Sequence, residues 1–161
     1  MLSAFTIIGK LMMQEAWMVG INWDDVLPRE IHNRAKLWMK EYELLNQITI
    51  PRNLVGKQSN LRQLHVFVDA SSTTYAAVCY RREQGKKKVK MKFVAVRVKV
   101  APIKVISVPR LELMDACLEL KLTRKVARAL QHDLTNVVFW SDSQDTLCWI
   151  RHHSRLWKTF G

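Results

Sequence analysis

The stretch LHVFVDASSTTYAAVCY, residues 64–80, decides the fold that the sequence predicts. Its first part, Leu64 to Val68, is a short apolar run of the kind found in buried strands, and it ends at Asp69. Small polar residues follow, as expected of a turn, and Tyr75 to Arg82 predicts a second strand. Two such runs joined by a short polar segment indicate paired strands at the start of a sheet.

A third strand is predicted from Val89 to Val100, and Gly85 marks the hairpin turn before it. The basic residues of this strand change from even to odd positions along the sequence: Lys90, Lys92, Arg97 and Lys99. Side chains on a strand alternate between faces with a period of two, so a β-bulge near Phe93–Val94 would explain the change.

After the third strand the chain alternates helix, strand and helix. A long helix is expected from about Pro109 to Leu130, a fourth strand from Val137 to Ser141, and a short helix from Ser143 to Arg151. Either Asp142 or Ser143 would cap the last helix. This order indicates an α/β fold with one mixed sheet and at least one helix packed across it.

The segment before the sheet reads as mostly helical from about Thr6 to Glu43. Residues 22–25 interrupt the pattern, a second helix follows Pro28, and Ile48 to Ser59 reads as a connector. Three tryptophans of this segment are expected to serve packing rather than base stacking: Trp17, Trp23 and Trp38. The sequence therefore predicts a short helical arm ahead of the α/β region.

The composition favours a polyanionic partner. The formal net charge is +12, and ten basic residues but one acid fall between Arg81 and Lys104. Such an excess favours nucleic acid, because binding releases counterions from the phosphate backbone. Three widely spaced cysteines without CxxC spacing argue against a zinc site and fit an intracellular compartment. No segment has the apolar length of a membrane span, so no membrane partner is expected.

Three acidic residues are candidates for metal chemistry. Asp69 and Asp142 each follow an apolar strand, where an aspartate can also serve a turn or a helix cap. Glu112 lies in the first turn of the long helix, at the margin of its apolar face. Carboxylates from two strand ends and one helix start suit Mg²⁺, which prefers oxygen ligands.

The long helix carries two stripes. Its apolar face, expected to pack on the sheet, gathers residues at helical spacing: Leu111, Met114, Leu118, Leu122 and Ala129. Asp115 and Glu119 continue the acidic stripe that begins at Glu112, roughly a quarter-turn away. We expect Asp115 and Glu119 to be solvated, as acidic stripes ordinarily are.

Several blocks of sequence resemble retroelement proteins. Residues 64–80 resemble the first strand and hairpin of retroelement ribonuclease H domains. VAPIKVISVPRLELMDACL, residues 100–118, is similar to the segment of BEL/Pao-type retrotransposon Pol polyproteins that leads into the Glu-bearing helix. VVFWSDSQDTLCWIRHHSRLWKTF, residues 137–160, resembles the strand with the second aspartate and its following helix. KLMMQEAW, WDDVLP and ITIPR resemble, more weakly, the connection between reverse transcriptase and ribonuclease H.

The resemblance implies a fold and a domain division. It implies a ribonuclease H-like mixed sheet with packed helices, truncated at the C-terminus and preceded by a short helical arm. Residues 1–58 would be the helical connection segment, and residues 59–161 the incomplete ribonuclease H-like domain. Partners would be an RNA–DNA hybrid or other nucleic acid and the reverse transcriptase portion of a polyprotein. The setting would be a cytoplasmic particle or the nucleus.

The resemblance also implies a site. Asp69, Glu112 and Asp142 match the family's first three metal ligands, which would hold two Mg²⁺ or Mn²⁺ ions and hydrolyse the RNA strand of a hybrid. Three small neighbours either orient these ligands or serve packing and capping: Ser71, Ser141 and Ser143. Basic residues expected to hold nucleic acid are Arg81, Arg82, Lys86, Lys87, Lys88, Lys90, Arg151, Arg155 and Lys158.

The sequence departs from the family in one respect. A fourth acidic ligand usually comes from a later helix, and no Asp or Glu follows Asp145 here. We therefore expect weak or undetectable cleavage of a hybrid by residues 1–161 alone. The alternative to a nuclease is a non-catalytic remnant that binds nucleic acid or packs against a polymerase.

Overall fold

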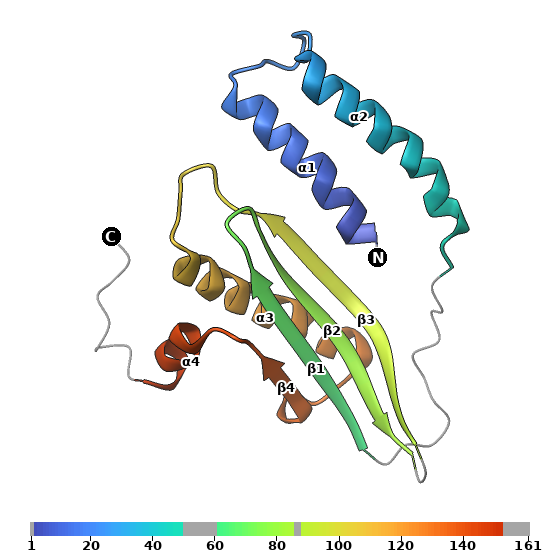
Figure 1. Ribbon diagram of the computed structural model, residues 1–161. Coiled ribbons are helices and arrows are strands. Elements are labelled where there is room, and N and C mark those ends of the chain that lie inside the picture. The colour runs from blue at the N-terminus through green and yellow to red at the C-terminus, as the bar shows by residue number, and fades with distance from the viewer. Residues whose placement is uncertain (1, 50–60, 86–87, 153–161) are drawn as a thin grey trace.

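The computed structural model describes residues 2–49, 61–85 and 88–152 (Figure 1). Its elements in chain order are α1 (Leu2–Met18), α2 (Arg29–Tyr42), the short helix η1 (Glu43–Gln47), β1 (Leu61–Ala70), β2 (Thr74–Gln84), β3 (Val89–Val100), α3 (Val108–Leu130), the short helix η2 (Leu134–Asn136), β4 (Val137–Trp140) and α4 (Gln144–Arg151). The predicted helices and strands are confirmed with small changes at their ends. Most of the expected connector lies outside the described residues.

The four strands form one mixed sheet in the order β3-β2-β1-β4. The pairs β1–β2 and β2–β3 are antiparallel, as expected of strands joined by short turns, whereas β4 runs parallel to β1. The turn between β2 and β3 is closed by a hydrogen bond from the Gly85 N–H to the Lys88 carbonyl. A parallel partner requires a crossover, and α3 supplies it between β3 and β4.

The predicted bulge is present in β3. Cys79 pairs with Ala95 and its neighbour Tyr80 pairs with Phe93, so Val94 is the additional residue. Because directly opposed residues share a face, the bulge brings four basic side chains to the face on which Arg81 and Ala77 of β2 lie. We call these four residues the basic strip: Lys90, Lys92, Arg97 and Lys99.

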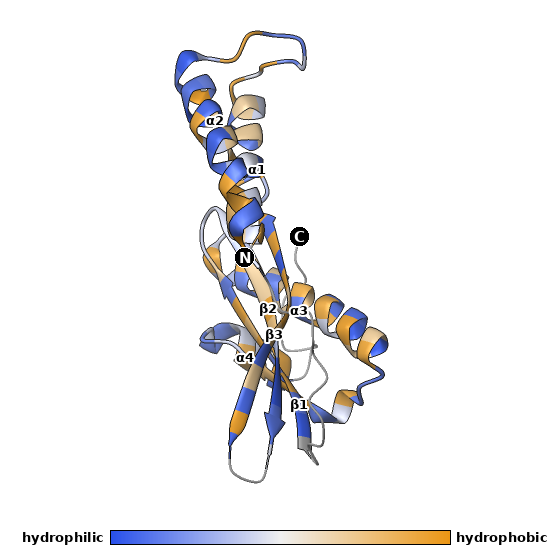
Figure 2. Ribbon diagram, turned by 90° about the vertical axis from the view of Figure 1, so that its right-hand side faces the viewer, coloured by the Kyte–Doolittle hydropathy of each residue, from blue (hydrophilic) through white to orange (hydrophobic). Residues whose placement is uncertain are grey.

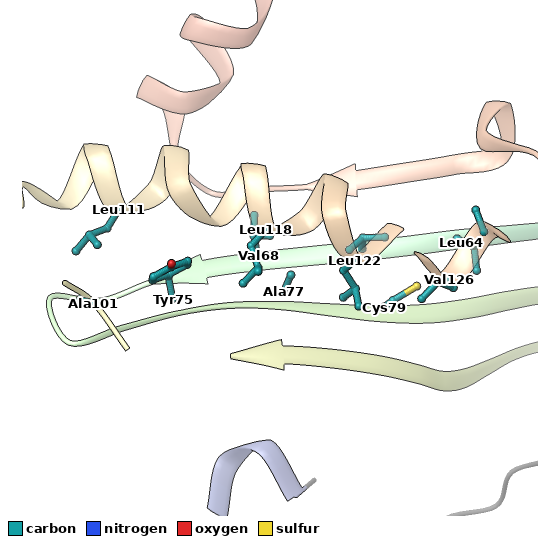
Figure 3. Close-up of a cluster of buried hydrophobic side chains, with 12 residues drawn as sticks. Leu64, Val68, Tyr75, Ala77, Cys79, Ala101, Leu111, Leu118, Leu122 and Val126 are labelled. Carbon is teal, nitrogen blue, oxygen red and sulfur yellow. The ribbon is translucent and has the colours of Figure 1, made fainter. Parts of the chain in front are cut away.

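The core lies between α3 and the sheet (Figure 3). Leu111 and Leu118 are buried and Met114 packs against the same cluster, which confirms the expected packing face. Ala129, expected on this face, is exposed, and Val126 and Ala127 are buried in the last turns instead. The buried side of α3 is thus rotated from the leucine stripe toward the acidic stripe.

Helices α1 and α2 pair with one another at the end of the sheet where β3 ends (Figures 1 and 2). Gln14 of α1 donates a 2.6 Å hydrogen bond to the Ala101 carbonyl just after β3. The Trp38 ring stacks on Phe5 at 4.9 Å, as packing requires, and its Nε1 donates to the Phe5 carbonyl. Trp17 and Trp23 contact each other edge to face but remain largely exposed. The packing expected of the tryptophans therefore holds fully only for Trp38.

No helix among the described residues is long and apolar enough to cross a membrane.

Candidate active site

Asp69 and Asp142 lie at the same end of two neighbouring parallel strands. In the register of β1 with β4, Phe67 pairs with Trp140, and each aspartate follows its member of that pair by two residues. Adjacent strands are about 4.8 Å apart, so the two aspartates occupy neighbouring positions at one end of the sheet. Both side chains are exposed, as a site open to substrate requires.

Glu112 reaches this end of the sheet from α3. Its neighbour Leu111 is buried in the core beside Tyr75, which fixes the start of the helix over the sheet (Figure 3). Ser143 Oγ donates a 2.6 Å hydrogen bond to Glu112 Oε2. Since Ser143 directly follows Asp142, this bond ties the start of α3 to the end of β4.

Ser143 performs both roles that the sequence left open. Its hydroxyl donates to Glu112 and also accepts a 3.1 Å hydrogen bond from the Thr146 N–H, which caps α4. Ser141 accepts from the Ser143 N–H, and Ser71 accepts from the Thr74 N–H in the turn after β1. Ser143 is thus the serine in contact with a candidate ligand, whereas Ser71 and Ser141 serve local backbone turns.

Asp115 is buried, and the expectation that it is solvated is wrong. It lies one helical turn after Glu112 and is 2% exposed. Burial raises the pKa of its carboxyl to about 7, and the charges of Glu112, Asp69 and Asp142 raise it as well. Three candidate ligands therefore act on one buried carboxyl, which makes these four acids a single electrostatic cluster.

Glu119 is also buried, at 5% exposed, so the same expectation is wrong for it. Burial raises the pKa of the Glu119 carboxyl to about 8, with a contribution from the charge of Asp115, and a hydrogen bond from the Trp140 backbone opposes this rise. Asp115 and Glu119 are both buried because α3 packs against more than one neighbouring element. It packs on β1 and β2 and also contacts α4, so its buried arc is wider than the leucine stripe suggests.

The donor chemistry of this cluster fits a hard divalent cation. Mg²⁺ and Mn²⁺ favour carboxylate oxygens, and a cluster of mutually repelling acids gains from a shared positive charge. In the ranges that the structure describes, no three Asp, Glu, His or Cys side chains are placed so that they could hold a metal ion together. The carboxylates are brought to one end of the sheet, but they are not arranged around a common point.

The expected nucleic-acid contacts differ in how far they are exposed. Arg81 is 6% exposed, and its guanidinium pairs with Glu83 at 3.1 Å. Arg82 donates to Gln63 and Gln84 and is half-buried. Three expected cations are exposed: Lys88, Lys90 and Arg151. The remaining four lie outside the described residues: Lys86, Lys87, Arg155 and Lys158.

The basic strip connects these cations to the acidic end of the sheet. At about 3.3 Å per residue it spans roughly 30 Å from Lys90 to Lys99. Lys99 pairs with Tyr75, which in turn pairs with Ala70, the residue after Asp69. The strip thus begins near the hairpin and ends two strands away from the candidate ligands.

Comparison with known proteins identifies the family. The family model described as the Pao retrotransposon-like RNaseH-like domain matches residues 1–143, most of the chain. No curated protein and no solved structure matches the chain. The mixed four-stranded sheet with α3 packed across it is consistent with a ribonuclease H-like fold. The chain belongs to the family of Pao retrotransposon-like RNaseH-like domains.

Proposed function

We propose that the chain carries a metal-dependent nuclease site for the RNA strand of RNA–DNA hybrids, with Asp69, Glu112 and Asp142 as metal ligands. One observation carries the proposal: Asp69 and Asp142 lie at neighbouring positions at one end of the sheet, and Ser143, next to Asp142, holds the Glu112 carboxylate there with a 2.6 Å hydrogen bond. Ribonuclease H-like domains generally use divalent metals, which supports the assignment.

Each residue has a stated task in this proposal. Asp69 and Asp142, at neighbouring strand ends, would hold two Mg²⁺ or Mn²⁺ ions together with Glu112. When bound, two such ions would supply an activated water and charge neutralisation at the leaving oxygen of a phosphodiester. Ser143 keeps the Glu112 carboxylate in place through its 2.6 Å hydrogen bond. The exposed aspartates leave room for a backbone phosphate.

The basic strip would hold the substrate backbone. Its span of roughly 30 Å approaches one turn of a duplex, about 34 Å, so phosphates could contact it at several points. Lys99 lies at the end nearest the candidate ligands, which would align the bound strand with them. A cationic surface beside an acidic metal site also separates the two tasks of binding and cleavage.

We also propose that residues 1–58 form a connection segment and residues 59–161 the nuclease-like domain. The α1–α2 pair leaves a cavity of about 500 Å³, lined mostly by apolar residues such as Met13, Trp17 and Met39. Exposed apolar surface of this kind favours a protein neighbour. The reverse transcriptase portion of a polyprotein would be that neighbour.

The test of the nuclease proposal is strand-specific cleavage. An RNA–DNA hybrid labelled on both strands is incubated with the chain and Mg²⁺ or Mn²⁺, alongside Asp69→Asn and a chelator control. Products from the RNA strand alone, lost in the variant and with chelator, support the proposal. Cleavage that persists in Asp69→Asn, or that needs no metal, contradicts it.

A second candidate function is non-catalytic binding of nucleic acid. It is favoured by the basic strip, whose four cations share one face of β3. Salt-sensitive binding of a hybrid without metal-dependent cleavage would select this function over the first.

A further inference from the structure

One face of α3 carries buried polar side chains, each with an oxygen that lacks a hydrogen-bond partner. In the described part of the chain, three oxygens have no hydrogen-bond partner: Asp115 Oδ1, Glu119 Oε1 and Thr123 Oγ1. An unpartnered polar atom in the interior is strongly unfavourable, most of all on an ionisable group. Each such atom therefore calls for a ligand or another compensating group.

Asp115 differs from the other two in its surroundings. It follows Glu112 by three residues, so both side chains leave the same side of the helix. The charges of Glu112, Asp69 and Asp142 all act on it. The ion pairs recorded within the described ranges join Glu15 to Arg34 and Glu83 to Arg81 and Lys92, and Asp115 is in none of them.

We propose that Asp115 is a fourth carboxylate ligand of the divalent-metal centre, beside Asp69, Glu112 and Asp142. This inference rests on the proposed function, because it concerns the same ions. A divalent cation, when bound, would offset the mutual repulsion of the four acids and would give Asp115 Oδ1 a partner. The fourth carboxylate would then come from α3, the helix that also carries Glu112.

Glu119 does not share this assignment. It lies about 6 Å further along the helix axis than Asp115, and the acid whose charge acts on it is Asp115. Each carboxyl accepts one backbone hydrogen bond, Asp115 from Ala116 and Glu119 from Trp140, the last residue of β4. Glu119 therefore provides a matched control: a buried acid on the same face of the same helix.

The test is Mn²⁺ binding to the full chain, measured by calorimetric titration. Asp115→Asn keeps the shape of the side chain and should weaken Mn²⁺ binding by about ten-fold or more, the loss seen when even a supporting group of a metal site is removed. Asp69→Asn should weaken it comparably. Glu119→Gln and Asp145→Asn, which remove one acid each elsewhere, should leave it unchanged.

Two results overturn the inference, and they are distinguishable. Unchanged Mn²⁺ affinity in Asp115→Asn with weakened affinity in Asp69→Asn removes Asp115 from the centre but leaves the proposed function intact. Equal Mn²⁺ affinity in the wild-type chain and Asp69→Asn removes the metal centre itself, and this inference with it.

A measurement on the unmutated chain covers the case in which Asp115→Asn does not fold. Substoichiometric Mn²⁺ broadens amide resonances close to the ion. The Asp115 amide should broaden together with those of Asp69 and Asp142 and before that of Asp145. Broadening at Asp69 and Asp142 that spares Asp115 contradicts its role as a ligand.

Discussion

Ser143 Oγ lies 2.6 Å from Glu112 Oε2, and the same oxygen accepts the N–H of Thr146. One hydroxyl therefore holds a candidate ligand of α3 and caps α4 at once. Ser143 is 6% exposed, so water does not readily replace either bond. This small contact fixes the position of Glu112 relative to Asp142, the residue that precedes Ser143.

Replacing Ser143 with alanine should lower the free energy of unfolding by about 1–2 kcal/mol, because the helix cap and the bond to Glu112 are both lost. Ser143→Thr, which keeps the hydroxyl, should lose less. Urea denaturation measures both, with the exposed Ser72→Ala as control. A Ser143→Ala chain as stable as the control would show that the contact is not formed in solution.

The raised pKa values of Asp115 and Glu119 predict how stability depends on pH without metal. Their carboxyls titrate at about 7 and about 8 in the folded chain, against 3.8 and 4.5 when unperturbed. Between these limits the folded chain holds protons that the unfolded chain has released. The free energy of unfolding should therefore fall as pH rises from about 4 to about 8, and then level off.

Paired substitutions isolate this effect. In the double variant Asp115→Asn, Glu119→Gln, the free energy of unfolding should depend much less on pH, since neither amide titrates. At pH 8 it should be higher than in the wild-type chain by an amount on the order of a few kcal/mol. Thermal melts in a chelating buffer from pH 5 to pH 9 measure it. A double variant with the same pH dependence as the wild-type chain would contradict the burial of these two acids.

The basic strip predicts the salt dependence of hybrid binding. Replacing Lys90 and Lys99 with alanine should weaken binding at low salt and reduce the slope of log K against log salt by about 0.9 for each lost phosphate contact. Lys36→Ala, an exposed lysine on α2, provides the control. Equal slopes for the wild-type chain and the double variant would exclude the strip from the interface.

At Gly9, α1 and α2 pack so closely that a larger residue would not fit. A Cβ at this position would lie 2.8 Å from Trp38 Cζ2, and the Trp38 ring is held by Phe5 through stacking and a hydrogen bond. Gly9→Ala should therefore destabilise the chain by about 1–3 kcal/mol, more than the gain of about 1 kcal/mol in helix propensity. Combining it with Trp38→Phe should relieve the clash. If the changes in the free energy of unfolding caused by the two substitutions simply add, the contact between Gly9 and Trp38 is contradicted.

The strands and the bulge could be predicted because they depend on local pattern. Leu64 to Val68 has the apolar run of a buried strand, and the change of phase from Lys92 to Arg97 can only place both on one face if an extra residue is inserted. The position of Asp69 at a strand end follows from the same pattern.

The burial of Asp115, Glu119 and Arg81 could not be predicted in this way. Each depends on which elements meet in space. α3 contacts α4 as well as β1 and β2, so its acidic stripe is enclosed, and Arg81 is buried because Glu83, two residues along the same strand, neutralises it. Likewise, the bond between Ser143 and Glu112 joins residues 31 positions apart.

If Asp69, Glu112 and Asp142 bind divalent metal together, the metal should raise the melting temperature of the folded chain. The melting temperature is measured with and without millimolar Mn²⁺ for the wild-type chain, Asp69→Asn, Asp142→Asn and the control Asp145→Asn. Metal that binds the folded state stabilises it by mass action. We predict that Mn²⁺ raises the melting temperature of the wild-type chain and of Asp145→Asn. The rise should be absent or much smaller in Asp69→Asn and Asp142→Asn. An equal rise in all four chains, or none in the wild-type chain, would contradict it.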